Sequence, residues 1–179
     1  YTEGTFLLCS IACLYYARTR RWWACGIFGY LTTLSRFNGL LIILPVGLEL
    51  LRANRLRWRA WLRPSTLWVS AIPLGTASYM AYQHVRFHNA FAFAVATAAW
   101  GRRPCWPWQS FTYYEPKYTA FHLLMFIGSP LLVLALALAM AALRFRPAYV
   151  VYSLASMLLA TSTYYLESMN RYMSVVFPM

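Results

Sequence analysis

The stretch LTTLSRFNGLLIILP, residues 31–45, places an arginine inside an apolar run that extends from residue 24 to residue 51. Burying an isolated charge in hydrocarbon costs at least ~2.5 kcal/mol, and Arg36 has no acidic neighbour along the chain. The run is also too long for one upright membrane helix, which needs about 20 residues. The way the chain accommodates Arg36 therefore decides the fold.

The composition predicts an integral membrane protein. Of the 179 residues, 61% are hydrophobic and only 11% are charged, whereas a soluble domain has roughly a quarter charged residues. Lys and Arg number 16 against 4 Asp and Glu. The arginines gather in short clusters between apolar runs, which cytoplasmic loops and anionic headgroups explain. We expect membrane lipid as a partner and no nucleic acid.

The apolar runs cover about 4–17, 24–51, 66–83, 119–143 and 148–166, and another begins at residue 172. One helix over 24–51 would put its two flanking arginine clusters on opposite sides of the membrane. A hairpin turning at Asn38-Gly39, residues that tolerate a left-handed helix end, puts both clusters in the cytoplasm. We predict an all-α, polytopic transmembrane helical bundle with a short helical hairpin at 24–51 and an extracytoplasmic loop at 84–118. Arg36 then lies at the extracytoplasmic tip of the hairpin.

The chain opens on Tyr1, shows no signal peptide and ends just inside an apolar run. We expect a single transmembrane domain over 1–179 that is part of a longer multi-pass protein. The four cysteines form no CxxC motif, so no redox motif is predicted. His84 and His88 have the spacing of a helical metal pair but lack an evident third ligand. We therefore expect neither a metal nor a cofactor.

Three charged residues on the predicted extracytoplasmic side are candidates for a binding site. Arg36 can bind a phosphate through bidentate hydrogen bonds, or it can extend to lipid headgroups. Glu3 can act as a site carboxylate or an acceptor for a sugar hydroxyl, or it can stabilise a helix N-terminus. Arg171 begins the last helix and opposes its dipole, so it needs Glu167 or a bound anion as partner.

The loop WGRRPCWPW, residues 100–108, has the most unusual composition in the chain. Trp106 and Trp108 can stack on the apolar faces of sugars, or they can belong to an interfacial aromatic belt. The preceding residues, 89–100, resemble a short amphipathic helix at the interface.

An ordered series of motifs resembles a known family. The series comprises YTE (1–3), RRWW (20–23), TLSRFNGL (33–40), AF (92–93), AWGR (99–102), WPW (106–108), SMNRY (168–172) and FP (177–178). In order and spacing it is similar to the PIG-V-type mannosyltransferases, which comprise the GPI mannosyltransferase that adds the second mannose and its prokaryotic relatives. The tryptophan loop and the ending resemble the prokaryotic branch more closely.

The resemblance implies a GT-C-like enzyme, which takes a sugar from a polyprenyl- or dolichyl-phosphate donor and passes it to a glycan or glycolipid acceptor. It implies a bacterial plasma membrane, or the endoplasmic reticulum if the source is eukaryotic, with chemistry on the extracytoplasmic or lumenal side. It assigns Glu3, Arg36, Asn38 and Arg171 to the donor phosphate and acceptor. The catalytic aspartate of this superfamily is expected upstream of Tyr1, and the chain contains no aspartate. We assign no catalytic residue here and expect this segment alone to be inactive.

Two other function classes remain open. A membrane transporter or lipid flippase could use the broken hairpin as a gate, since interrupted helices are typical of transporters. A non-catalytic membrane subunit is the other alternative, and it predicts polar residues scattered over both membrane faces.

Overall fold

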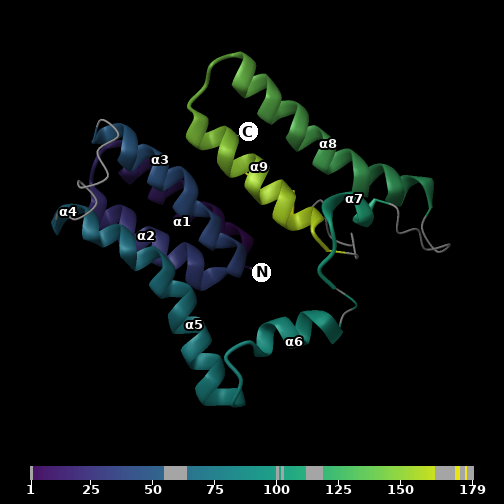
Figure 1. The fold of residues 1–179 in the computed structure, drawn as a ribbon, viewed down its shortest axis with the longest axis horizontal. Helices are drawn as coiled ribbons and strands as arrows, with labels where there is room; N and C mark the ends of the chain where they lie inside the picture. The colour runs from purple at the N-terminus through teal and green to yellow at the C-terminus, as the bar shows by residue number, and fades with distance from the viewer. Residues whose placement is uncertain are drawn as a thin grey trace. The chain divides into compact units, whose positions relative to one another are not determined.

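The computed structural model describes residues 2–54, 64–99, 101, 103–111, 119–163, 172–173 and 176, except the side chains of residues 64, 65 and 123. The only regular secondary structure in the described residues is helical, and one isolated bridge joins Pro104 and Thr163, so the all-α prediction is confirmed. Its contacts divide it into two compact units, a first unit Tyr1–Ala90 and a second unit Phe91–Met179 (Figure 1). That residues 1–179 form a single domain stays a prediction.

The first unit is built from α1 (Glu3–Arg18), α2 (Trp22–Ser35), the 3-10 helix η1 (Phe37–Ile42), α3 (Ile43–Ala53), α4 (Pro64–Leu67), the 3-10 helix η3 (Trp68–Ser70) and α5 (Ala71–Phe87). The helices α1 and α2 pack as an antiparallel pair, and α3 returns alongside α1 (Figure 1). Residues 24–51 therefore do not form one continuous helix, in agreement with the predicted interruption.

The position of the interruption differs from the prediction. The break is at Arg36, whose backbone is extended with φ −153° and ψ 138°, whereas Asn38 and Gly39 continue within η1. Neither of them has a positive φ, so the left-handed helix end expected at Asn38-Gly39 is wrong. Gly39 is needed for a different reason, because a Cβ atom there would lie 2.5 Å from the carbonyl oxygen of Thr32.

The helices α2 and α5 approach each other closely and run in parallel. A Cβ atom at Gly26 would lie 2.2 Å from the backbone oxygen of Trp68, and one at Gly75 would lie 2.2 Å from Oγ1 of Thr33. The Thr33 hydroxyl also donates a hydrogen bond of 2.7 Å to the carbonyl of Ile72. Small residues thus allow the two backbones to pack at short distance, as in helix pairs of membrane proteins.

The second unit contains α6 (Ala92–Ala99), α7 (Pro107–Ser110), α8 (Ala120–Ala142) and α9 (Pro147–Thr161). The last two form a helical pair whose core includes Phe126 and Val133 of α8 and Met157 of α9. They match the helices predicted at 119–143 and 148–166. The predicted loop at 84–118 is partly helical, since α5 continues to Phe87 and α6 and α7 lie within it.

One helix in the described part of the chain is long and apolar enough to cross a membrane, α8. Its most apolar window has a mean hydropathy of 2.5 and is 29% buried. α9 is apolar but shorter, at 15 residues.

Candidate functional site

Arg36 and Glu3 form an ion pair in the first unit. Nη2 of Arg36 donates to Oε1 of Glu3 at 2.5 Å, and Nε donates to the Thr2 hydroxyl at 3.2 Å. The two charged side chains are only 15% and 22% exposed. The arginine that lacks an acidic neighbour in sequence therefore has one in space, and their attraction offsets part of the cost of burying the charge.

The antiparallel packing of α1 on α2 creates this pair. α1 begins at Glu3 and α2 ends at Ser35, so the start of one helix and the end of the other lie at the same level. The Arg36 guanidinium also lies 6.0 Å from the ring centroid of Phe6 on α1, within the range of a cation–π interaction. Glu3 and Arg36 are separate candidates along the sequence, and the fold brings them together.

The Arg36 guanidinium retains hydrogen-bonding capacity. An arginine side chain has five N–H donors, and Glu3 and Thr2 accept from two of them. Among the described residues, we find no acceptor for the remaining donors. A phosphate oxygen is a strong acceptor for guanidinium N–H groups, so the site can bind an anion without first breaking the ion pair.

Asn38 lies two residues beyond Arg36 in η1 and is half-buried. No residue in the described part of the chain hydrogen-bonds with its side chain, in contrast to Ser35, whose hydroxyl donates to the Thr32 carbonyl at 2.8 Å. The side-chain amide of Asn38 is thus available to a ligand.

The register of α2 against α5 sets the depth of this site. Gly26 of α2 lies against Trp68, and Thr33 of α2 lies against Ile72 and Gly75. Extending this pairing along the two parallel helices puts Arg36 level with about Ser78 of α5. α5 continues for nine further residues to Phe87, which at 1.5 Å per residue is about 13 Å. The Arg36 site is therefore recessed from the end of α5, and Figure 1 shows α5 extending beyond the end of α2.

Trp106 and Trp108 form an aromatic platform in the second unit. Their rings stack with centroids 5.1 Å apart and an interplanar angle of 8°, and each residue is 63% exposed. The backbone N–H of Trp106 donates to Oε1 of Gln109 at 3.1 Å, and that of Cys105 donates to the Ser162 carbonyl at 3.1 Å. These bonds hold an exposed indole surface against the end of α9.

Burial raises the pKa of the Cys105 thiol beside this platform. The thiol is therefore protonated at neutral pH and is a weak nucleophile. The platform can offer stacking surface, but Cys105 gives it no nucleophilic chemistry.

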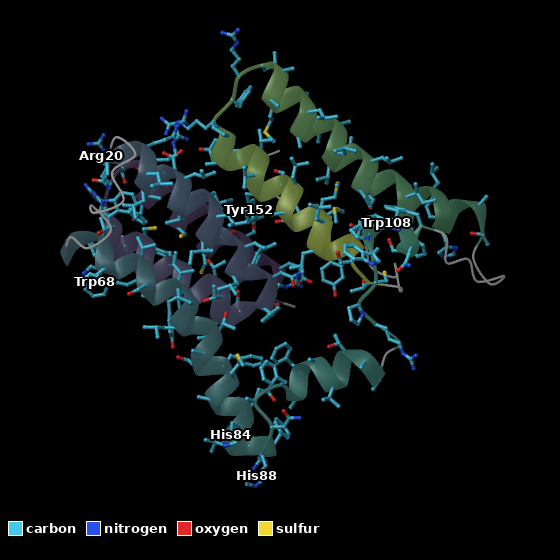
Figure 2. All side chains as sticks on the ribbon, in the orientation of Figure 1. Arg20, Trp68, His84, His88, Trp108 and Tyr152 are labelled. Atoms are coloured by element: carbon cyan, nitrogen blue, oxygen red, sulfur yellow. The ribbon has the colours of Figure 1, made fainter. Side chains whose placement is uncertain are left out.

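His84 and His88 lie at the far end of α5, as Figure 2 shows. His84 is in the last turn, whereas His88 follows the helix in a left-handed conformation with φ 54°. Their side chains are both exposed. Within the described residues, no group of three or more His, Cys, Asp or Glu side chains could hold a metal ion.

The contact between Cys13 and Cys25 was not predicted from the sequence. Their sulfur atoms lie 3.7 Å apart in the α1–α2 interface, and both residues are fully buried. The two residues are equally far along the chain from the turn near residue 19, and two antiparallel helices bring such residues side by side. This spacing could have indicated the contact.

Several predicted residues lie outside the described part of the chain. They are Arg171, Glu167, Trp100 and Arg102, together with Arg55, Arg57, Arg59 and Arg63 of the arginine cluster that follows residue 51. The proposed role of Arg171 at the donor phosphate therefore stays a prediction. No protein-family model, curated protein or solved structure matches this chain, so its relationship to the PIG-V-type mannosyltransferases also stays a prediction.

Proposed function

We propose that this chain is part of a multi-pass membrane glycosyltransferase of the GT-C type, a mannosyltransferase that uses a polyprenyl- or dolichyl-phosphate sugar donor. The observation that carries the proposal is the Arg36 site. A guanidinium lies at the break between two short helices, is oriented by Glu3 and Thr2, and keeps N–H donors for an anion. The resemblance of the motif series to PIG-V-type mannosyltransferases supplies the class of reaction.

Insertion of several helices into the membrane is part of this proposal. The first unit exposes large apolar side chains on successive helices, as does α8 of the second unit, whereas soluble proteins rarely expose contiguous apolar patches larger than a few hundred Å². These exposed side chains include Leu8, Ile11, Ile27, Leu31, Leu34, Leu74, Leu124, Leu131, Leu132 and Leu138. Hydrocarbon is the environment that such a surface favours.

The recessed position of Arg36 fits a donor whose phosphate is attached to a membrane lipid. A lipid-linked phosphate enters from the bilayer and can reach a site about 13 Å below the end of α5, provided that a polar cavity opens there. Irregular backbone, such as that of Arg36, is tolerated at membrane depth where it lines such a cavity. The amide of Asn38 and the guanidinium of Arg171 are the further proposed phosphate ligands.

In the proposed reaction, a carboxylate upstream of Tyr1 takes the proton of an acceptor hydroxyl. The hydroxyl oxygen attacks the anomeric carbon of the donor sugar as the bond from that carbon to the phosphate oxygen breaks. The phosphodiester thereby becomes a phosphomonoester and gains negative charge. Arg36 stabilises this developing charge, an effect that is worth 10²–10³ in rate for a single well-placed donor.

The test is a transfer assay on the full-length protein in detergent, with a synthetic polyprenyl-phosphate mannose and a glycolipid acceptor. Arg36→Gln should lower kcat/KM about 100-fold or more, and Arg36→Lys should retain part of the activity because it keeps the charge. Arg86→Gln, which removes an exposed arginine at the far end of α5, is the matched control and should leave activity unchanged.

The same assay separates the proposal from a transporter or flippase. A flippase moves the donor lipid across the bilayer without breaking the sugar–phosphate bond, so it releases no free polyprenyl phosphate. Wild-type-like transfer by the Arg36→Gln enzyme would contradict the role of Arg36. Donor translocation without transfer would contradict the enzymatic proposal itself.

A further inference from the structure

Three residues other than glycine have a positive φ in the described part of the chain, and all three are basic residue types. They are Arg20 (58°), His88 (54°) and Arg144 (57°). His88 directly follows the last residue of α5, whereas Arg20 and Arg144 lie one residue beyond the C-caps of α1 and α8. Glycine is strongly preferred at this position because a Cβ atom is sterically unfavourable there. A large side chain kept in a strained conformation indicates a role for that side chain.

The turn at Arg20 does not need an arginine. The N–H of Arg20 donates to the Ala17 carbonyl at 3.2 Å, and the N–H of Arg21 donates to the Tyr16 carbonyl at 2.9 Å. This is the Schellman pattern of backbone bonds, which glycine forms with less strain. A cation can also stabilise a helix C-terminus, but Arg18 already supplies one in the last turn of α1.

The same pattern recurs at the end of α8. There the N–H of Arg144 donates to the Ala141 carbonyl at 3.1 Å, and the N–H of Phe145 donates to the Met140 carbonyl at 2.9 Å. Two helices in separate units thus end in the same motif, with an arginine where glycine is preferred.

Arg20 belongs to a group of exposed arginines at one end of the first unit. Arg20 and Arg21 lie between α1 and α2. Arg52 lies in the last turn of α3, which returns alongside α1 to the same end (Figure 1). We call Arg20, Arg21 and Arg52 the basic rim. Within the described residues, none of the three has an acidic partner, and Glu49 of α3 is buried. The sequence adds four arginines between residues 55 and 63, whose structure is outside the described residues.

Exposed tryptophans accompany the basic rim. Trp23, the second residue of α2, is 56% exposed, and Trp68 is 49% exposed. Figure 2 shows Trp68 at the same end of the first unit as Arg20. Tryptophan is enriched where a membrane protein meets the headgroup region. In the part of the chain that the structure describes, the basic rim therefore combines guanidinium groups that have no acidic partner with the side chains that mark a lipid–water interface.

We propose that the basic rim binds the phosphate of an acidic glycerophospholipid, with Arg20 as the central ligand. Guanidinium groups bind phosphate through short, charge-assisted hydrogen bonds. The adjacent indoles favour a phosphate attached to acyl chains over one free in water. This inference depends on membrane insertion of the first unit, and it is independent of sugar transfer because the rim lies at the opposite end of α1 and α2 from Arg36.

The experiment uses the full-length protein in nanodiscs of phosphatidylcholine with increasing phosphatidylglycerol, and native mass spectrometry counts the retained phosphatidylglycerol. Arg20→Gly should weaken its retention about fivefold, the effect of one cation near an anionic surface, while the helix turn is kept. Arg20→Lys should retain it. Arg20→Gly combined with Arg21→Gln and Arg52→Gln should weaken it about 100-fold.

Arg86→Gln is the matched control, because it removes an exposed arginine from the far end of α5. The proposal would be overturned if the folded Arg20→Gly protein retained as much phosphatidylglycerol as the wild type, or if Arg86→Gln lost as much of it as Arg20→Gly. It would also be overturned if glycerol 3-phosphate displaced the lipid completely, because that would indicate a site for free phosphate. If Arg20→Gly does not fold, Arg20→Asn tests the same point, since asparagine tolerates the left-handed conformation. Failure of the transfer assay alone would leave this proposal standing.

Discussion

The Glu3–Arg36 pair allows the clearest test of the fold of the first unit. Replacing either residue with glutamine leaves the other charge buried without its partner. The hydrogen-bonded atoms are 2.5 Å apart, so the charge centres lie about 4 Å apart, and their attraction at an effective dielectric constant of 20 is about 4 kcal/mol. After desolvation is subtracted, each single substitution should lower the free energy of unfolding by about 2–3 kcal/mol.

The double variant Glu3→Gln/Arg36→Gln leaves no unpaired charge, so it should lose no more than either single variant. The coupling energy in this double-mutant cycle should therefore be about 2–3 kcal/mol. Reversible unfolding in detergent micelles, followed by helix content, measures all four proteins, and Arg86→Gln should change stability by less than about 0.5 kcal/mol. Additive effects of the two single substitutions would refute the pairing.

A charge swap separates the structural role of the pair from its proposed role in catalysis. Glu3→Arg/Arg36→Glu restores an ion pair between the same two positions, so stability should return to within about 1 kcal/mol of the wild type. The swap also places a carboxylate where the donor phosphate is proposed to bind, and transfer should remain about 100-fold or more below the wild type. Full activity in the swapped enzyme would refute a phosphate contact by Arg36.

Three further predictions follow from packing and the platform. Gly75→Ala should destabilise the first unit by about 1–3 kcal/mol, because the new Cβ atom would overlap Thr33. The control Gly128→Ala should not lower stability, because nothing lies within 4 Å of a Cβ atom at that position. Thermal unfolding in detergent measures both variants. Mild oxidation with copper phenanthroline should link Cys25 to Cys13, whose sulfur atoms are 3.7 Å apart, and peptide mass spectrometry would detect the bond. A bond from Cys25 to Cys9 in its place would contradict the α1–α2 register. Trp108→Ala should lower kcat/KM for the acceptor about tenfold if the platform stacks on sugar, and Trp108→Phe should retain most activity; equal loss in both would argue against stacking.

Much of the helical layout could be predicted from local patterns. The apolar run over 119–143 predicted α8 almost to the residue, because 20 or more consecutive apolar residues leave few alternatives to a helix. The interruption of 24–51 was also predictable, since its length and the flanking arginines disfavour one helix. The exact break was not, because Asn-Gly is a frequent helix end and the sequence cannot show that Gly39 instead allows close approach to Thr32.

The residues of the candidate site could be predicted from the sequence, but the contacts between them could not. The series of motifs pointed to Glu3, Arg36 and Asn38, yet 33 residues separate Glu3 from Arg36, and no local rule pairs them. Likewise, the arginines around residue 20 were evident as a cluster, while the left-handed backbone of Arg20 appears only where α1 ends and α2 begins.

The sequence by itself determined that the chain is helical, strongly apolar and interrupted near Arg36, because composition and hydrophobic length act on each segment separately. Only the tertiary structure decided what Arg36 contacts and how deep it lies. Those depend on the antiparallel packing of α1 on α2 and on the glycine-mediated register of α2 against α5. The physical reason is that a buried charge is stabilised by whichever groups packing brings within a few ångströms, and such groups come from distant parts of the chain.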